Sequence, residues 1–502
     1  MTSKVSMSKT QAYQEAVIAV NRFGLGARPG ELEEAASNPR AWLLNQMKAP
    51  QFDTQTINTE SAFRQYSSLR ANRVKRNKLQ NDMQNSLKSS LKNNMQAGDQ
   101  KQSANAISTP SMFSNKKTKA AGGMTNYSKL MRQTKKQLLT ENMWQSVNTA
   151  DSFSMRLLDF FSNHFSVSMS TVQLNVLAPL LEREAIAPHL FGRFEDMLVA
   201  VIKHPAMLIY LDNTRSMGPN SKVGLKRKKR GLNENLAREI LELHTLGIDG
   251  GYRIGDIQTL AKAISGWSVS SPKEDQQKGF VYRKDFHEPG QRRMFGKKYN
   301  ERRATQQGER ILRDLARHPS TALFVSRKLA QYFISDNPSD ALVNSMAKEW
   351  KTTNGDLRAV IITLVEHDDS WQTERQKFKT PREFMVSSLR AIDAKPDAPR
   401  YFFQGIINHL TEMGQAPFKS GSPAGYSTYA EAWTGSDALI KRIDWLNKLN
   451  SVTPKLNDTV LALSQQLFGD TVSESTLLTI QRAESARQAR TLLLMSPEFQ
   501  RR

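Results

Sequence analysis

The stretch from Gly231 to Gly247, GLNENLAREILELHTLG, gives the strongest indication of fold in this sequence. On a helical wheel at about 100° per residue, its apolar residues fall in one stripe about 80° wide. The stripe consists of Leu232, Leu236, Ile240, Leu243 and Gly247. Such a stripe is typical of a helix that packs against a core. Because glycine commonly follows the last turn of a helix, we expect a helix from Asn233 that stops at Gly247.

One edge of this stripe is polar. Asn235, Glu239 and Glu242 follow one another at spacings of four and three residues, which stacks their side chains along one flank. Arg238 lies just beyond them and is spaced to pair with Glu242 and with Glu234. On the wheel, Asn233 and His244 fall on the opposite flank.

Two interpretations of this polar flank remain open. Carboxylates at the edge of an apolar stripe are partly buried, which is costly unless they are paired or coordinated. In the structural interpretation, Arg238 neutralises the acids and Asn235 caps a neighbouring loop. In the functional interpretation, Glu239 and Glu242 bind a divalent cation or act as acid and base, and need His or Asp partners from elsewhere in the chain.

Several polar residues are candidates for that partnership. They are His164, His204, Asp212, Asn213, His287 and His318, with Asn233 and Glu234 from the helix itself. For any single histidine, a structural role is the more common one. Because His204 and His318 each precede a proline, we expect their rings to accept hydrogen bonds from backbone amides at the start of a helix.

The sequence carries no HExxH, GxSxG, P-loop or GxGxxG motif, so no standard catalytic class is indicated. Its 502 residues include no cysteine, which excludes disulfides, thiolate zinc sites and cysteine nucleophiles. The cofactor stays unknown from the sequence, with a divalent metal ion as the one option that the acidic residues suggest.

Helical periodicity continues through most of the chain. Beyond 231–247 it marks residues 13–23, 31–36, 39–47, 152–165, 173–184, 194–203, 256–267, 311–317, 321–333, 342–350, 357–366, 381–392, 402–413, 436–449, 459–468 and 475–495. Strand signals are few, and residues 279–282 and 284–286 are predicted to form a short hairpin. We therefore expect a mainly α protein with one large multi-helix fold, as a single body or as two lobes, and a minor short β-hairpin.

Composition divides the chain into three parts. Residues 1–51 form a first helical part, residues 52–140 a basic insertion rich in Gln, Asn and Lys, and residues 141–502 the main helical body. We expect the insertion to be helical at its ends and mobile around 96–125. The two outer parts are predicted to belong to one domain.

The net charge of +23 lies almost entirely in two segments. Residues 64–136 contain 16 Lys and Arg against two Asp, and residues 222–230 contain six Lys and Arg and no acid. Either segment can bind an anionic polymer or surface such as nucleic acid. The alternative is that both are solvated loops, since few aromatic residues are present to stack on bases.

The N-terminus has no signal-peptide pattern, and no stretch approaches the roughly 20 apolar residues of a membrane span. These two features favour a cytoplasmic protein without a transmembrane segment. A leader that has been removed would give the same sequence.

Several long motifs together resemble the bacterial "domain of unknown function 1800" family. They occur in order at residues 19–31 (AVNRFGLGARPGE), 160–168, 204–213, 233–252, 256–267, 286–296, 317–333, 378–391 and 413–426 (MGQAPFKSGSPAGY). The resemblance covers almost the whole chain. Three features depart from the family pattern, namely the lack of a visible export signal, the long basic insertion and the KRKKR loop beside the polar helix. In the family, the position of His244 often holds an apolar or aromatic residue.

The resemblance implies a helical protein without an established activity. Family members are often exported, so it also implies a periplasmic or surface-associated location as the alternative to the cytoplasm. Their genes often neighbour those of a family similar to alkaline-phosphatase-type hydrolases, and the product of such a gene is therefore a possible partner.

Three functions remain open from the sequence. The first is a metal-dependent enzyme or ligand binder that uses the Glu, Asn, Arg and His residues named above. The second is a non-enzymatic partner or scaffold for a co-encoded envelope protein. The third, and the least favoured, is binding of nucleic acid or an anionic surface through the basic segments.

Overall fold

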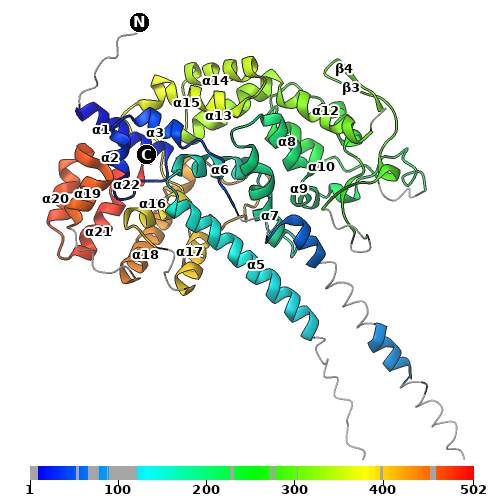
Figure 1. Cartoon of the computed structure of the whole chain (residues 1–502), viewed down its shortest axis with the longest axis horizontal. Helices are drawn as coiled ribbons and strands as arrows, with labels where there is room; N and C mark the ends of the chain where they lie inside the picture. Colours follow the sequence, from blue (N-terminus) through cyan, green and yellow to red (C-terminus); the bar gives the residue numbers. More distant parts are fainter. Residues whose placement is uncertain are drawn as a thin grey trace, which may run out of the picture.

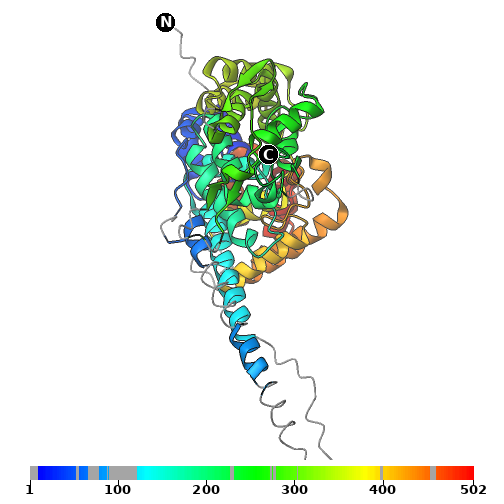
Figure 2. The ribbon, with the colours of Figure 1, turned by 90° about the vertical axis from the view of Figure 1, so that its right-hand side faces the viewer.

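The computed structural model describes residues 9–52, 56–65, 78–86, 89, 121–226, 231–271, 274, 279–301, 304–395, 400–452 and 459–502. Figures 1 and 2 show the chain from two sides.

Helices dominate the described residues. The first part contains α1 (Lys9–Ile18), the π-helical turn η1 (Ala19–Phe23), α2 (Glu31–Ala36) and α3 (Pro39–Asn45). Then follow α5 (Ala121–Asn148), α6 (Ser152–His164), α7 (Leu174–Leu181), the π-helical turn η2 (Glu182–Ile186), α8 (Phe194–Lys203), α9 (Pro205–Tyr210), α10 (Asn235–Glu239), the π-helical turn η5 (Ile240–His244) and α11 (Ile254–Ala263). The later part contains α12 (Ala304–Ala316), α13 (Pro319–Phe333), α14 (Asp340–Thr353), α15 (Leu357–Glu366), α16 (Pro381–Ala391), α17 (Arg400–Glu412), α18 (Ser436–Val452), α19 (Val460–Phe468), α20 (Glu474–Gln481), α21 (Ala486–Met495) and α22 (Pro497–Gln500). Short 3-10 turns are η3 (Ala187–His189), η4 (Asn213–Arg215), η6 (Lys284–Phe286), η8 (Asp368–Trp371), η9 (Ala430–Trp433) and η10 (Gly469–Thr471).

The buried apolar side chains form one hydrophobic cluster that extends from Ala16 to Phe499. Segments from both ends of the chain therefore share a core. In Figure 1, α1–α3 lie beside α19–α22, α12–α15 follow the upper edge, and α6 crosses the middle of the body. In both views α5 projects beyond the body (Figures 1 and 2). The expectation of a mainly α protein is confirmed.

An aromatic cluster joins the first helical part to the centre of the body. The rings of Phe23, Phe153 and Phe333 lie 5.9–6.0 Å apart, and they come from η1, α6 and α13. All three side chains are fully buried. Burial of each contributes roughly 1.5–3 kcal/mol, so this cluster fixes α6 relative to its neighbours.

The strands form two small antiparallel pairs. β1 (Trp267–Val269) pairs with β2 (Phe280–Tyr282), and β3 (Arg292–Met294) pairs with β4 (Lys297–Tyr299). The predicted strand at 279–282 is confirmed, but its predicted partner at 284–286 is wrong. Those residues form η6, and the strand instead pairs with β1, whose first residue, Trp267, was predicted to end a helix. Gly266 permits this change because its φ of +81° ends the helical path before β1.

Within the segment from Gly231 to Gly247, only Asn235–His244 is helical, and these residues do not form one regular α-helix. α10 is followed directly by the π-helical turn η5, which holds more residues than an α-helical turn and rotates the later side chains relative to the wheel. As a result, His244 and Leu241 are fully buried and Leu243 is only half-buried. The predicted positions of Leu243 and His244 are therefore wrong. Gly247 has the positive φ, +82°, of a glycine that follows a helix, but the helical part already ends at His244, before the predicted stop.

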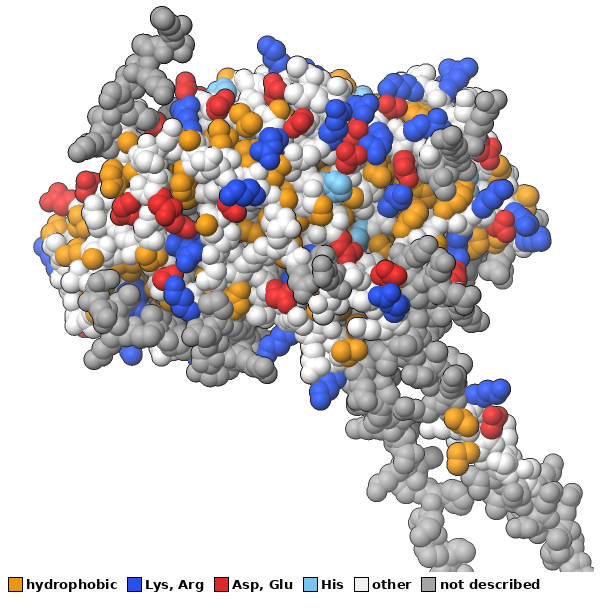
Figure 3. Space-filling model, viewed as in Figure 1, with side chains coloured by type: hydrophobic (Ala, Val, Ile, Leu, Met, Phe, Trp, Pro, Cys, Tyr) orange, Lys and Arg blue, Asp and Glu red, His pale blue; other side chains and the backbone are white. Residues whose placement is uncertain are grey.

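The predicted basic insertion is described only in part. Residues 59–65 and 78–86 are helical, and α5 begins at Ala121 within the stretch predicted to be mobile. Residues 90–120 and 227–230, which carry much of the predicted basic charge, lie outside the described residues. On the described surface in Figure 3, basic side chains are interspersed with acidic ones. Among the described residues, no helix combines the length and apolarity needed to cross a membrane.

Candidate functional site

The polar flank predicted on α10 exists and is largely solvent-facing. The guanidinium of Arg238 donates to Oε1 of Glu242 at 3.2 Å, and both side chains are partly exposed. Glu239 is half-buried near the hydroxyl of Tyr210. Burial raises the pKa of Glu239, and the charge of Glu242 raises it further. Tyr252 contacts Glu242 from the following loop.

At the start of α10 the side chain of Asn233, and not that of Asn235, accepts a backbone hydrogen bond. Oδ1 of Asn233 accepts a hydrogen bond from the backbone N–H of Asn235 at 2.9 Å, whereas the Asn235 side chain is exposed. The Nδ2 of Asn233 donates to the carbonyl of Asp212 at 3.2 Å. Asn233 and Asp212 also line an open hollow of about 360 Å³. Glu234 is half-buried and immediately precedes α10.

His164 reaches the same segment, but on its buried face. Nε2 of His164 lies 3.2 Å from the carbonyl of His244, and Nδ1 of His244 lies 3.1 Å from the carbonyl of His164. Nζ of Lys328 donates to Nδ1 of His164 at 3.1 Å. Burial and the charge of Lys328 lower the pKa of His244 to about 3 and hold the pKa of His164 well below its usual value. Both rings are therefore neutral at physiological pH.

The two histidines that precede prolines cap helices, as predicted. Nδ1 of His204 accepts from the backbone N–H of Ala206 at 3.2 Å, and Nδ1 of His318 accepts from Ser320 at the same distance. Nε2 of His204 also lies 3.3 Å from Oε2 of Glu184. These contacts assign both rings a structural part at the starts of α9 and α13.

The remaining candidates are separate from α10. Asn213 is fully buried and donates to the carbonyls of Ile264 and Trp267. Nδ1 of His287 faces the carbonyl of Ser265 at 3.0 Å. Within the described residues, no group of three or more His, Asp or Glu side chains is arranged to hold a metal ion. Of the predicted histidines, His164 contacts this segment through His244 on its buried face and not through the polar flank.

A different set of polar residues converges on a cavity between α6 and α16, which we call the α6–α16 pocket. Its volume is about 100 Å³, and it opens to solvent. Its walls come from α5, α6, η2, α13, the start of α16 and the loop 415–428. The pocket therefore gathers segments that are more than 250 residues apart in the sequence.

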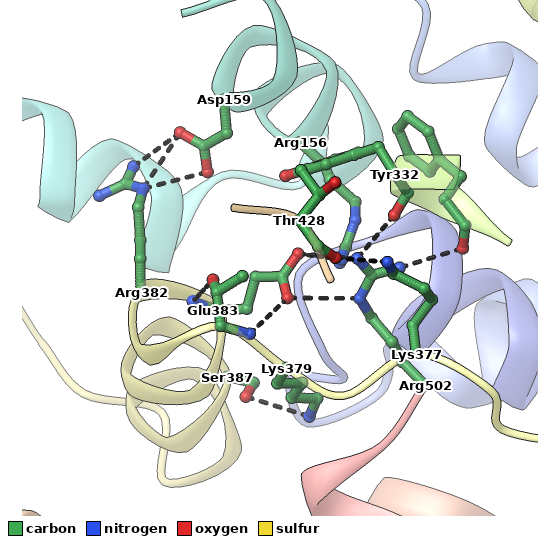
Figure 4. Close-up of polar contacts among 12 residues, drawn as sticks. Arg156, Asp159, Tyr332, Lys377, Lys379, Arg382, Glu383, Ser387, Thr428 and Arg502 are labelled. Atoms are coloured by element: carbon green, nitrogen blue, oxygen red, sulfur yellow. Dashed lines mark hydrogen bonds and ion pairs between the residues drawn. The ribbon is translucent and has the colours of Figure 1, made fainter. Parts of the chain in front are cut away.

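An ion pair forms one wall of this pocket. Nε of Arg382 donates to both carboxylate oxygens of Asp159 at 3.1 Å, and the side chains of the two residues are mostly buried. The other end of the guanidinium donates to Oδ1 of Asn142 and to Oγ of Ser146, each at 2.9 Å. Figure 4 shows Arg382 and Asp159 facing each other from α16 and α6.

Glu182 lies at the end of this chain of contacts. Its Oε1 accepts a hydrogen bond from Nδ2 of Asn142, and the Ser162 hydroxyl also bonds to its carboxyl. Only 3% of Glu182 is exposed. Burial, followed by the nearby charge of Asp159, raises the pKa of Glu182 to about 7, although Arg382 opposes the shift. Glu182 therefore exists in both protonation states near neutral pH.

A second carboxylate, Glu383, has a lowered pKa, in contrast to the raised pKa of Glu182. Arg156 and Arg502 both donate to it, and the backbone N–H of Thr380 donates to it at 2.9 Å. These contacts overcome burial and lower the pKa of Glu383 to about 2. In Figure 4 the two arginines converge on this carboxylate. Because its oxygens are saturated, Glu383 anchors α16 and is unsuited to proton transfer.

The loop 415–428 closes the pocket and is held in one conformation. Asn163 donates to the carbonyl of Tyr426 at 2.9 Å and accepts from the Tyr426 N–H at 2.7 Å. The Tyr426 hydroxyl donates to the carbonyl of Ala416 at 2.7 Å. Gly425 has a φ of +83°, and a Cβ there would lie 2.4 Å from the Asn163 carbonyl oxygen. The loop is thus tied directly to α6.

Sequence reasoning did not single out any residue of this pocket, although several lie inside the motifs quoted above. A usable signal was present. Asp159 and Glu182 each interrupt a strongly apolar run, in SFSMRLLDFF and in LAPLLEREAI. An ionisable residue within such a run is buried with a partner or has a perturbed pKa, and either outcome marks it for inspection.

The whole of this architecture falls within one family match. The family model described as "Protein of unknown function (DUF1800)" matches residues 18–501, which include every segment that lines the pocket. Searches among curated proteins and among solved structures found no match. The chain therefore belongs to the DUF1800 family.

Proposed function

We propose that the chain is an enzyme that binds a neutral, hydroxyl-rich small molecule in the α6–α16 pocket and moves a proton through Glu182. The observation that carries this proposal is the pKa of about 7 that burial gives this carboxyl beside a solvent-open cavity. A general acid or base works best when its pKa is close to the working pH, because both of its forms are then available.

The lining of the pocket favours a neutral ligand. The charges of its walls are already paired, Arg382 with Asp159, and Glu383 with Arg156 and Arg502. The other polar lining groups are hydroxyls and amides, from Ser162, Asn163, Gln415, Ser420, Tyr426, Ser427 and Thr428. Hydroxyls and amides both donate and accept hydrogen bonds, which matches the hydroxyls of a polyol or sugar.

The size of the pocket limits what enters it. A volume of about 100 Å³ corresponds to roughly three water molecules at about 30 Å³ each. A ligand therefore inserts one small end, while the remainder lies outside the opening. This arrangement presents one or two ligand hydroxyls to the buried carboxyl of Glu182.

The surrounding side chains fix the geometry of proton transfer. Asn142 donates to Oε1 of Glu182, and the Ser162 hydroxyl also bonds to this carboxyl, so its orientation is fixed from two sides. Arg382 holds Asn142 in turn and is itself fixed by Asp159. In its neutral form Glu182 donates to a ligand oxygen, and in its ionised form it accepts a proton from a ligand hydroxyl.

The test is a thermal-shift screen with a panel of neutral probes, namely glycerol, myo-inositol, glucose and N-acetylglucosamine. We expect at least one probe to stabilise the wild type, and the pH dependence of its binding to show a midpoint of about 7 that is lost in E182Q. E141Q is the matched control, because Glu141 pairs with Arg183 next to Glu182 but does not line the pocket.

If no probe stabilises the protein, or if binding to E182Q keeps the same pH dependence, the proposal is wrong. A structural role of Glu182 alone would change stability but would not change the pH dependence of probe binding.

The polar flank of α10 is the second candidate site. It is favoured by the raised pKa of Glu239, whose carboxyl lies next to that of Glu242 and near the Tyr210 hydroxyl. If this flank binds a ligand or a divalent ion, E239Q abolishes the binding and leaves the melting temperature unchanged. Binding of Mg²⁺, Mn²⁺ or Zn²⁺ measured by calorimetry tests this, and equal binding to wild type and E239Q would exclude it.

A further inference from the structure

A second cavity is lined by three arginines and, among the residues that the structure describes, by no acidic side chain. It has a volume of about 250 Å³ and lies among η1, α1, η10 and the segment that follows η8. Arg22, Arg375 and Arg502 line it, together with Gln14, Val17, Ile18, Asn21, Thr373 and Thr471. Arg22 and Asn21 belong to the motif AVNRFG, which the α6–α16 pocket does not use.

The charge of Arg22 has no carboxylate partner among the described residues. Its two terminal nitrogens donate to the backbone carbonyls of Ser370 and Glu374, at 2.8 and 2.6 Å. Its Nε is buried without a hydrogen-bond partner in the described part of the chain, and the residue is only 2% exposed. A buried, incompletely bonded guanidinium is costly, so the site is completed by an acceptor that binds from the cavity.

The neighbouring arginines increase this excess of positive charge. Arg375 donates to the hydroxyl of Thr471 at 2.8 Å and forms no ion pair within the described residues. Glu498, whose charge acts on Arg375, already accepts hydrogen bonds from Ser473 and Thr476. Burial and the charges of Arg502 and Arg375 lower the pKa of Arg22 to about 10, as expected for like charges close together.

Arg502 is the one arginine of the three with an acidic partner. It donates to Glu383 and to the carbonyls of Tyr332 and Phe333. Because Arg156 also donates to Glu383, this single carboxylate is shared between two guanidiniums. The cavity therefore retains a clear excess of positive charge.

We propose that this arginine cavity is a binding site for a tetrahedral oxyanion, a phosphate or sulfate that is either free or the charged end of a larger ligand. Guanidinium groups bind such oxyanions through paired, charge-assisted hydrogen bonds, and several of them converging on one cavity suit a dianion better than a carboxylate. A volume of about 250 Å³ accepts a tetrahedral oxyanion with some of its water, at about 30 Å³ for each water molecule. The site is separate from the α6–α16 pocket and does not depend on the activity proposed there.

Isothermal titration calorimetry with inorganic phosphate, inorganic sulfate and acetate, at constant ionic strength in chloride, tests the assignment. We expect saturable binding of phosphate or sulfate, with one anion per chain, and no saturable binding of acetate. R375Q is expected to weaken this binding at least about tenfold, because it removes a charge-assisted contact. R283Q is the matched control, since Arg283 is also partly buried but pairs with Glu274 far from the cavity.

A second variant keeps the test decisive if circular dichroism shows that R375Q does not fold. Gln14 is exposed and lines the cavity, so Q14E adds a negative charge there without disturbing the core. We expect Q14E to weaken phosphate or sulfate binding by at least several-fold. The proposal is overturned if neither phosphate nor sulfate binds saturably, or if acetate binds as tightly as these two anions. It is also overturned if R375Q binds phosphate and sulfate like the wild type, or if Q14E does so where R375Q does not fold.

Discussion

Replacing Glu182 by glutamine is expected to change the stability of the protein in a pH-dependent way. Glutamine keeps the shape of the side chain and an oxygen that accepts from Asn142, but it does not titrate. In the folded protein the pKa of Glu182 is raised from 4.5 to about 7. Each pKa unit corresponds to about 1.36 kcal/mol, so the raised pKa is worth about 3 kcal/mol.

The sign of the effect follows from proton binding in the two states. Between about pH 4.5 and 7 the unfolded chain releases the Glu182 proton while the folded protein keeps it, so wild-type stability falls as the pH rises. Below this window Glu182 is protonated in both the folded and the unfolded protein, and above it Glu182 is ionised in both, so its contribution to stability no longer changes with pH. Relative to the wild type, E182Q should therefore gain about 3 kcal/mol between about pH 4.5 and 8.

Calorimetric unfolding of wild type and E182Q at several pH values measures this gain. Unfolding entropy is about 2.1 cal/mol/K per residue, or about 1 kcal/mol/K for 502 residues that unfold together, so 3 kcal/mol corresponds to about 3 °C. E141Q shows how the loss of a neighbouring carboxyl outside the pocket behaves. If the difference between E182Q and wild type does not change with pH, Glu182 does not have a raised pKa and the reasoning is refuted.

Four further results are expected. R382A should lower the free energy of unfolding in urea by about 3–5 kcal/mol, because it leaves a mostly buried carboxylate unpaired, and a loss below about 1 kcal/mol would contradict this. Burial lowers the pKa of Lys328 to about 8, so more of its amine is neutral and reactive near neutral pH than in the exposed lysines. A small acylating reagent should therefore label Lys328 faster than those lysines, as measured by peptide mapping with mass spectrometry. Slower labelling of Lys328 would contradict the lowered pKa. E242Q should cost less than about 1 kcal/mol, since its ion pair is solvent-exposed, and a larger loss would favour a structural network there. G425A should lower the melting temperature and destabilise by at least about 1–3 kcal/mol, because the φ of Gly425 is positive and the loop lies against α6. A variant as stable as the wild type would show that the loop is not fixed in this way.

The sequence was sufficient to predict most helices, because their apolar residues recur at helical spacing. It was less reliable where the backbone changes its period. The turn at Ile240–His244 is π-helical, and its residue types do not distinguish it from an α-helical turn. The helical wheel, which assumes α-helical spacing, therefore misplaced His244. The partner of the strand at 280–282 was also missed, since Trp267 completes an apparent helical pattern and yet begins a strand.

The candidate site was harder to predict for a different reason. Its residues are far apart in the sequence, and each has a plausible local role when considered alone. Thr380 and Glu383, for example, form a capping box at the start of α16, which is how the sequence TPRE would ordinarily be read. Only the packing of α5, α6, η2 and α16 shows that Glu182 and the Arg382–Asp159 pair line one cavity. The polar flank of α10 was visible from sequence because all of its residues lie on one helix.

The central claim is that Glu182 holds a proton near neutral pH in the α6–α16 pocket. Difference infrared spectra of wild type minus E182Q, recorded across a pH titration, test it most directly, because a protonated carboxyl and a carboxylate absorb separately. We predict a protonated-carboxyl band that belongs to Glu182 at about pH 6 and that fades with a midpoint of about 7. A spectrum at about pH 6 that shows only the carboxylate of Glu182 would contradict the account.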